Sequence, residues 1–134
     1  MLRALLLESL HPVATSILRA EGVEVITRTG ALDDDELAEA LQGVHLLGIR
    51  SKTQVTERVL DRAPDLLAVG AYCIGTNQID LGAAAHRGVA AFNAPFSNTR
   101  SVVEIALAEI IALTRRLTER DKALHAGVWD KSAE

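Results

Sequence analysis

The chain has 134 residues, enough for one domain or for one domain and part of another. Its 14 basic and 18 acidic residues give a net charge of −4 without any basic run, which argues against a nucleic-acid-binding protein. Cys73 is the only cysteine, so no internal disulfide can form, and a reducing cytoplasm is the compartment that fits best. No apolar stretch reaches the ~20 residues that span a bilayer, and we expect no membrane association.

Short apolar runs alternate with amphipathic segments along the chain. The predicted strands are Leu2–Leu7, Val23–Ile26, Val44–Ile49, Leu66–Gly70 and Val89–Phe92. The predicted helices between them are His11–Glu21, a segment from Asp33 to Leu41, one that starts at Thr56 and ends at Pro64, and Leu81–Arg87. Strands that alternate with helices pair in parallel, and continuous apolar strands indicate a sheet covered on both faces. The sequence therefore predicts an α/β fold: a flavodoxin-like parallel five-stranded sheet with helices on both faces.

The last predicted element is a long helix. Ser101 and Glu104 have the spacing of a capping box, which predicts that the helix begins with Ser101 as its N-cap. Within Val102–Leu113 only Glu104 and Glu109 are charged. A helix that is apolar nearly all round must be buried on most sides, and a five-stranded domain of ~100 residues cannot cover it completely. We therefore expect this helix to pack on a partner chain or on a further domain.

Three loops that follow predicted strands carry residues suited to anion binding. Arg50 and Ser51 follow the third strand, where a guanidinium and a hydroxyl suit a carboxylate or phosphate, although Arg50 could equally be a surface residue that begins a loop. Gly75 follows the fourth strand and could let backbone N–H groups approach a ligand, or simply form a turn. Asn98 follows the fifth strand and could bond a substrate oxygen or help to start the long helix. Such loops lie along one edge of a parallel sheet, so we expect one crevice.

The sequence argues against a P-loop, a reactive thiol and a metal site. Gly43–Gly48 is followed by Ile49 and Arg50 rather than by Lys and Ser or Thr, so it is not a phosphate-binding P-loop. Cys73 lies among apolar neighbours with no base beside it in sequence, and we expect a buried, unreactive thiol. We predict no metal site, because none of the four histidines has metal-ligand spacing; they are His11, His45, His86 and His125.

Several of these motifs occur together in a known family. They are Gly48-Ile-Arg50-Ser51, Cys73-Ile-Gly75-Thr76-Asn77-Gln-Ile-Asp80, Phe92-Asn-Ala-Pro-Phe-Ser-Asn98-Thr-Arg-Ser101, Glu104 and His125-Ala-Gly-Val-Trp129. The chain, from Leu5 to Lys131, resembles the D-isomer-specific 2-hydroxyacid dehydrogenases, in particular the members that oxidise 3-phosphoglycerate with NAD in serine biosynthesis. The string from Phe92 to Ser101 is the most specific part of the resemblance.

The resemblance implies two α/β domains. Residues 1–98 would form the substrate-binding domain, and residues 99–134 would form a crossover and dimerisation helix and the start of an NAD-binding Rossmann domain. A homodimer would assemble through the helix at residues 101–120. The substrate would be 3-phosphoglycerate or a similar 2-hydroxy acid, and Thr76 would lie near the nicotinamide of NAD. The residues implied to bind the substrate are Arg50, Ser51, Ile74, Gly75 and Asn98.

The family's cofactor loop and catalytic groups have no counterpart in this sequence. The family's G-x-G-x-x-G follows shortly after the region of Trp129, its catalytic His, Glu and Arg come later, and none of the four histidines here matches the catalytic one. Hydride transfer needs a bound cofactor and a general acid–base. We therefore expect an amino-terminal fragment of a dehydrogenase that has no catalytic residues and is inactive by itself. The alternatives are a fragment of another dehydrogenase of the family, or a stand-alone binding or dimerisation module.

Overall fold

The computed structural model describes residues 1–129. The chain divides into two compact units, one over Met1–Ser97 and one that begins at Asn98. The expected assignment of residues 99–134 to the start of a Rossmann domain stays a prediction, and residues 130–134 lie outside the described part.

The first unit is built on a parallel sheet of five short strands. In chain order its elements are β1 (Arg3–Leu6), α1 (Pro12–Ala20), β2 (Glu24–Thr27), α2 (Asp34–Ala40), β3 (Leu46–Ile49), α3 (Glu57–Asp61), β4 (Ala68–Ala71), α4 (Leu81–His86) and β5 (Ala90–Asn93). The strands lie in the order β2-β1-β3-β4-β5, and every neighbouring pair is parallel. This is the flavodoxin-like order, so the predicted fold class is confirmed.

Local side-chain chemistry explains where these helices begin. Asp33 and Glu36 form a reciprocal capping box at α2, with the Asp33 carboxylate accepting from the Glu36 N–H at 2.9 Å and Glu36 accepting from the Asp33 N–H at 3.2 Å. Thr56 and Asp80 cap α3 and α4 through single side-chain bonds. Gly88, with a φ of +70°, lets the chain turn back after α4 into β5. These local signals fix where α2, α3 and α4 begin, and with that where the loops after β2, β3 and β4 end.

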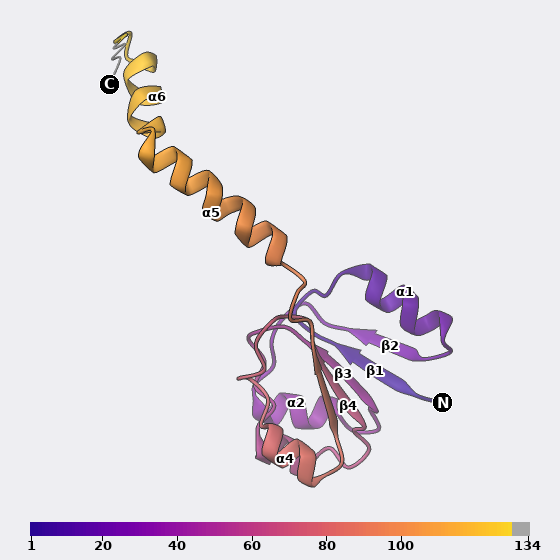
Figure 1. Cartoon of the computed structure of the whole chain (residues 1–134). Helices are drawn as coiled ribbons and strands as arrows, with labels where there is room; N and C mark the ends of the chain where they lie inside the picture. The colour runs from indigo at the N-terminus through magenta and orange to yellow at the C-terminus, as the bar shows by residue number, and fades with distance from the viewer. Residues whose placement is uncertain (130–134) are drawn as a thin grey trace. The chain divides into compact units, whose positions relative to one another are not determined.

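Two apolar clusters lie on opposite faces of the sheet. The larger one joins strand residues such as Leu47 and Val69 to Leu37 and Val59 of the helices. The smaller one joins Ala4, Leu6 and Val25 of β1 and β2 to Ala14 of α1. Figure 1 shows α1 on one side of the sheet and α2 and α4 on the other, as predicted.

The face that α1 covers is only partly closed within this unit. All four residues of β5 are exposed, and Phe92 has 63% of its surface accessible. The smaller cluster includes no residue of β4 or β5. The β4–β5 part of this face therefore carries apolar side chains without a covering helix in the first unit.

The second unit holds α5 (Thr99–Thr114) and α6 (Leu117–His125). The predicted capping box is wrong, because α5 begins earlier, with Asn98 at the N-cap. The Glu104 carboxylate instead pairs with Arg100 one turn away, at 2.6 Å.

The predicted helix over residues 101–120 is also interrupted. Arg116 is in the left-handed conformation, with φ 51° and ψ 42°, and it separates α5 from α6. Just before it, the Thr114 hydroxyl bonds the carbonyls of Ile110 and Ile111. None of the helices within residues 1–129 is long and apolar enough to cross a membrane.

Candidate functional site

The loops after β3 and β4 are joined at the carboxyl edge of the sheet. The buried side chain of Gln78 donates from Nε2 to the Arg50 carbonyl at 2.7 Å and to the Gly75 carbonyl at 3.3 Å. The same nitrogen lies 3.2 Å from the Cys73 sulfur. The expectation of a buried thiol is wrong, because Cys73 is only half-buried where it fills the space between these loops. The adjacency of β3 and β4 in the sheet brings the two predicted loops together.

The loop after β5 joins the same edge. Asn93 donates from Nδ2 to the Ile74 carbonyl at 2.8 Å. The backbone N–H of Ala94 donates to the Cys73 carbonyl at 2.9 Å. Three loops from distant parts of the sequence therefore form one hydrogen-bonded surface, as expected for the ligand edge of an open α/β sheet.

Arg50 presents a positive charge at this edge. Arg50 and Ser51 are both exposed directly after β3. Within residues 1–129 the Arg50 guanidinium has no hydrogen-bond or ion-pair partner, whereas Arg58 and Arg62 both bind Asp35. A guanidinium that is not engaged by the protein keeps its donor fork available for a carboxylate or phosphate.

Sequence reasoning missed Glu8. This residue is buried at the end of β1, and its carboxylate accepts from the backbone N–H groups of Arg50 at 3.2 Å, Lys52 at 3.1 Å and Thr53 at 2.9 Å. Burial would raise the pKa of Glu8, but hydrogen bonding by Thr53, Lys52 and Arg50 outweighs it and lowers the pKa below its ordinary value. The available signal was an acidic residue immediately after an apolar strand.

The Gly75 turn contains three of the predicted site residues. Ile74 is 47% exposed, Gly75 is exposed, and Thr76 is half-buried. A Cβ at Gly75 would lie 2.7 Å from Asn77 Oδ1, so a side chain there would force Asn77 to move. The turn is exposed beside Arg50, but the roles of these residues toward substrate and nicotinamide stay predictions.

Asn98 belongs to the second unit. It occupies the N-cap position of α5, yet its side chain makes no cap hydrogen bond. Asn98 therefore starts the helix by its position and not through a side-chain hydrogen bond. Its contact with substrate stays a prediction.

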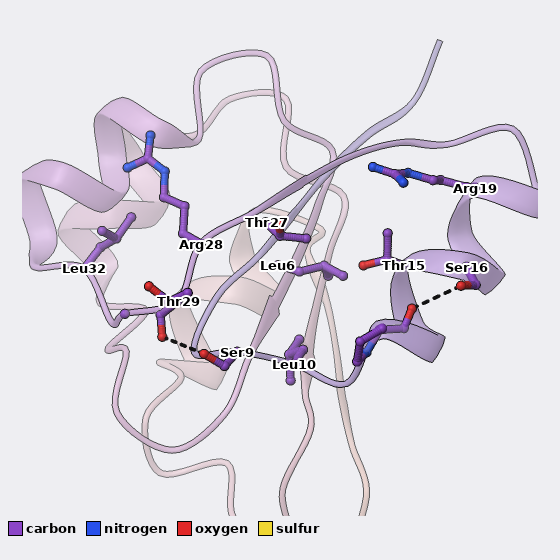
Figure 2. Close-up of a pocket in the computed structure, with 12 residues that line it drawn as sticks. Leu6, Ser9, Leu10, Thr15, Ser16, Arg19, Thr27, Arg28, Thr29 and Leu32 are labelled. Atoms are coloured by element: carbon purple, nitrogen blue, oxygen red, sulfur yellow. Dashed lines mark hydrogen bonds between the residues drawn. The ribbon is translucent and has the colours of Figure 1, made fainter.

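A separate cleft of about 860 Å³ lies beside α1 and the carboxyl ends of β1 and β2 (Figure 2). Two of its hydroxyls are engaged internally: Ser9 donates to the Thr29 carbonyl at 3.1 Å, and Ser16 to the Pro12 carbonyl at 3.2 Å. None of the predicted site residues lines it. No group of three or more His, Cys, Asp or Glu side chains that could hold a metal ion occurs in the described part of the chain.

The first unit is a flavodoxin-like α/β domain, and at the carboxyl edge of its sheet Arg50 has no side-chain partner among residues 1–129. The chain belongs to the D-isomer specific 2-hydroxyacid dehydrogenase family, whose catalytic-domain model matches residues 4–126. This finding agrees with the resemblance carried by the loop motifs.

The chain is similar to named enzymes of this family and to solved structures. The chain is 48% identical over 133 residues to D-3-phosphoglycerate dehydrogenase of Escherichia coli K12, which covers 98% of this chain and 32% of that protein. D-3-phosphoglycerate dehydrogenase 2 of Saccharomyces cerevisiae is 48% identical over 129 residues, or 96% of this chain and 28% of that protein. The D-lactate dehydrogenase of Aquifex aeolicus, solved with NAD and lactic acid, shares the fold with a TM-score of 0.78 at 19% identity, over 97% of this chain and 39% of that one. The chain thus spans about a third of these curated relatives or less.

Proposed function

We propose that this chain is the substrate-binding part of an NAD-dependent D-3-phosphoglycerate dehydrogenase. The whole protein would oxidise 3-phosphoglycerate to 3-phosphohydroxypyruvate for serine biosynthesis in the cytoplasm. The identity of 48% to enzymes of that name, over nearly the whole chain, supports this substrate over other 2-hydroxy acids. The proposal is carried by Arg50, which is exposed where the loops after β3, β4 and β5 join and has no side-chain partner among residues 1–129.

The site's own residues account for binding and orientation. Arg50 would hold the carboxylate or phosphate of the substrate through its donor fork, with Ser51 adding a hydroxyl donor. Backbone around Ile74 and Gly75 would line the same site, and Asn98 is the further substrate-binding residue that the family resemblance implies. A 2-hydroxy acid held in this way presents its hydroxyl-bearing carbon in a fixed orientation, which lowers the entropic part of the barrier.

NAD is the cofactor we propose for the whole protein. The turn at Gly75 and the half-buried Thr76 fits contact with the nicotinamide end only, and the sequence contains no G-x-G-x-x-G to hold a pyrophosphate. NAD supplies hydride acceptance when it is bound. The family membership and the NAD complex of the Aquifex aeolicus enzyme support this choice. By itself the chain should form no NADH from 3-phosphoglycerate and NAD, and steady turnover by the purified chain would contradict this part of the proposal.

The experiment for the site is Arg50→Ala in the whole protein. The loss of a charge-assisted contact costs on the order of 1.5–3 kcal/mol, which corresponds to at least a tenfold rise in KM for 3-phosphoglycerate. The control is Arg87→Ala, since Arg87 precedes β5 at the opposite edge and binds Asp61 and Glu57. An unchanged KM in Arg50→Ala would remove Arg50 from the site.

A further inference from the structure

Arg50 is an exposed residue whose main chain is held from both sides by buried side chains. Its N–H donates to Glu8 Oε1 at 3.2 Å, and its carbonyl accepts from Gln78 Nε2 at 2.7 Å. Glu8 and Gln78 are only 7% and 3% exposed. Neither side chain approaches from the loop that contains Arg50: one comes from the end of β1 and the other from the turn before α4.

Glu8 is costly to bury, and its hydrogen bonds show what offsets that cost. An ionised carboxylate in the interior is destabilising unless several donors satisfy it. Both Glu8 oxygens are used: Oε1 accepts from the Arg50 and Thr53 N–H groups, and Oε2 accepts from the Lys52 N–H. A leucine at this position would fill the space but could not hold three N–H groups of one loop.

Gln78 is itself held in place. Its carbonyl accepts from the Val55 N–H at 2.8 Å, in a short parallel bridge between Val55 and Ile79. Its side-chain amide then reaches both Arg50 and Gly75. The shortest bond between the Gly75 turn and the Arg50 loop is thus made by this buried amide, and the half-buried Cys73 thiol adds longer contacts to the same two carbonyls, 3.5 Å to Arg50 and 3.3 Å to Gly75.

We propose that Glu8 and Gln78 are positioning residues, which hold the Arg50 main chain so that the guanidinium meets the anionic group of the substrate. This inference rests on the proposed function. A bidentate contact depends on placement of the donor fork within about 0.5 Å, and a long flexible side chain achieves this only from a fixed backbone. The Glu8 carboxylate binds three backbone N–H groups of the loop and makes no bond to the Arg50 guanidinium.

The test is a double-mutant cycle in the whole protein, with KM for 3-phosphoglycerate, KM for NAD, kcat and melting temperature as readouts. The single variants are Arg50→Ala, Glu8→Gln and Gln78→Ala, and the double variants combine Arg50→Ala with each of the others. Glu8→Gln keeps the size of the side chain but replaces one acceptor oxygen with a donor that faces N–H groups. We expect each positioning variant to raise KM for 3-phosphoglycerate roughly tenfold. Glu8→Gln should change KM for NAD much less, because within residues 1–129 Glu8 makes no bond to the Gly75 turn.

In the Arg50→Ala background the same changes should add little to KM, because the guanidinium that they position is gone. Gln42→Ala is the matched control, since Gln42 Nε2 also joins two carbonyls, those of Ala38 and Arg62, away from the site. It should leave KM unchanged.

The outcomes separate this inference from the proposed function. If Arg50→Ala raises KM but Glu8→Gln and Gln78→Ala raise it by the same factor with or without Arg50, the two residues do not act through Arg50 and the inference is overturned. If Arg50→Ala itself has no effect on KM, the proposed substrate site is wrong, and with it the positioning role. If Glu8→Gln does not fold, the Gln78→Ala cycle decides alone.

Discussion

Gly48 lies in β3 at a point where there is no room for a methyl group. A Cβ there would be 2.5 Å from Leu6 Cδ2, 3.0 Å from Leu10 Cδ1 and 3.2 Å from Tyr72 Cε2. Gly48 is also the residue two positions before Arg50, so any shift of the strand moves the start of the site. At the residue scale, the tight packing at Gly48 therefore constrains stability and also the proposed substrate site.

Gly48→Ala should lower the free energy of unfolding by roughly 1–3 kcal/mol, the usual cost of overpacking. The measurement is urea denaturation of the purified chain. Gly30→Ala is the matched control, because a Cβ at Gly30 meets nothing within 4 Å and its φ lies outside the left-handed region. Equal stability of the two variants would show that Leu6 and Leu10 move aside at no cost.

The lowered pKa of Glu8 gives a pH prediction. Because its pKa is lower in the folded than in the unfolded chain, Glu8 stabilises the fold fully above the unfolded value near 4.5, and this contribution is lost as the pH falls through the lower folded value. Glu8→Gln should therefore destabilise the chain most at neutral pH, and the difference from the wild-type chain should shrink as the pH falls below about 4.5. Thermal unfolding from pH 7 to pH 3 measures this. A difference that stays constant with pH would contradict the assignment.

At the scale of elements, α5 is the helix whose environment is incomplete. None of its residues is buried, and large apolar side chains are exposed around it, including Val102, Ile105, Ile110 and Leu113. Exposed apolar patches of this kind mark interfaces. This agrees with the homodimer through residues 101–120 that the sequence resemblance implies, which stays a prediction.

Ile110→Asp should weaken self-association of the chain, because a buried, unpaired carboxylate at an apolar interface costs several kcal/mol. Sedimentation velocity of the wild-type chain should show a dimer or larger species, and the variant should shift toward the monomer. Val13→Asp, on the exposed side of α1, is the control and should leave the distribution unchanged. A wild-type chain that stays monomeric at high concentration would count against α5 as the interface.

The sequence predicted those features that depend on neighbouring residues. The helix starts at Asp33 and Thr56 were predictable because each cap bond spans three positions, and parallel pairing follows from alternating strands and helices. Ser101 misled because the competing partner of Glu104, Arg100, also lies within one helical turn. Glu8 could not be found, since its bonds join residues 42 to 45 positions apart and depend on the placement of β1 beside β3.

At the scale of the molecule, the first unit has unequal faces. One is closed by α2, α3 and α4 over the larger cluster, while α1 closes only the β1–β2 part of the other. Phe92 lies in β5 but is mostly exposed, so its side chain should contribute little to the stability of the unit.

Phe92→Ser should reduce the binding of a hydrophobic dye to the chain and change its melting temperature little, because most of the ring is already in water. Val69→Ser, in the neighbouring strand but fully buried, should lower the melting temperature sharply. Dye fluorescence and thermal denaturation measure the two effects. A large loss of stability in Phe92→Ser would show that the ring is covered.

The position of β5 at the end of the strand order also leaves one row of its backbone N–H and C=O groups without a neighbouring strand in the sheet. Its four residues, Ala-Ala-Phe-Asn, carry no charge and no proline, the features by which natural proteins protect such edges. A second copy of the chain can therefore pair with this row edge to edge. A lysine in place of Ala91 would be the simplest protection against such edge-to-edge pairing.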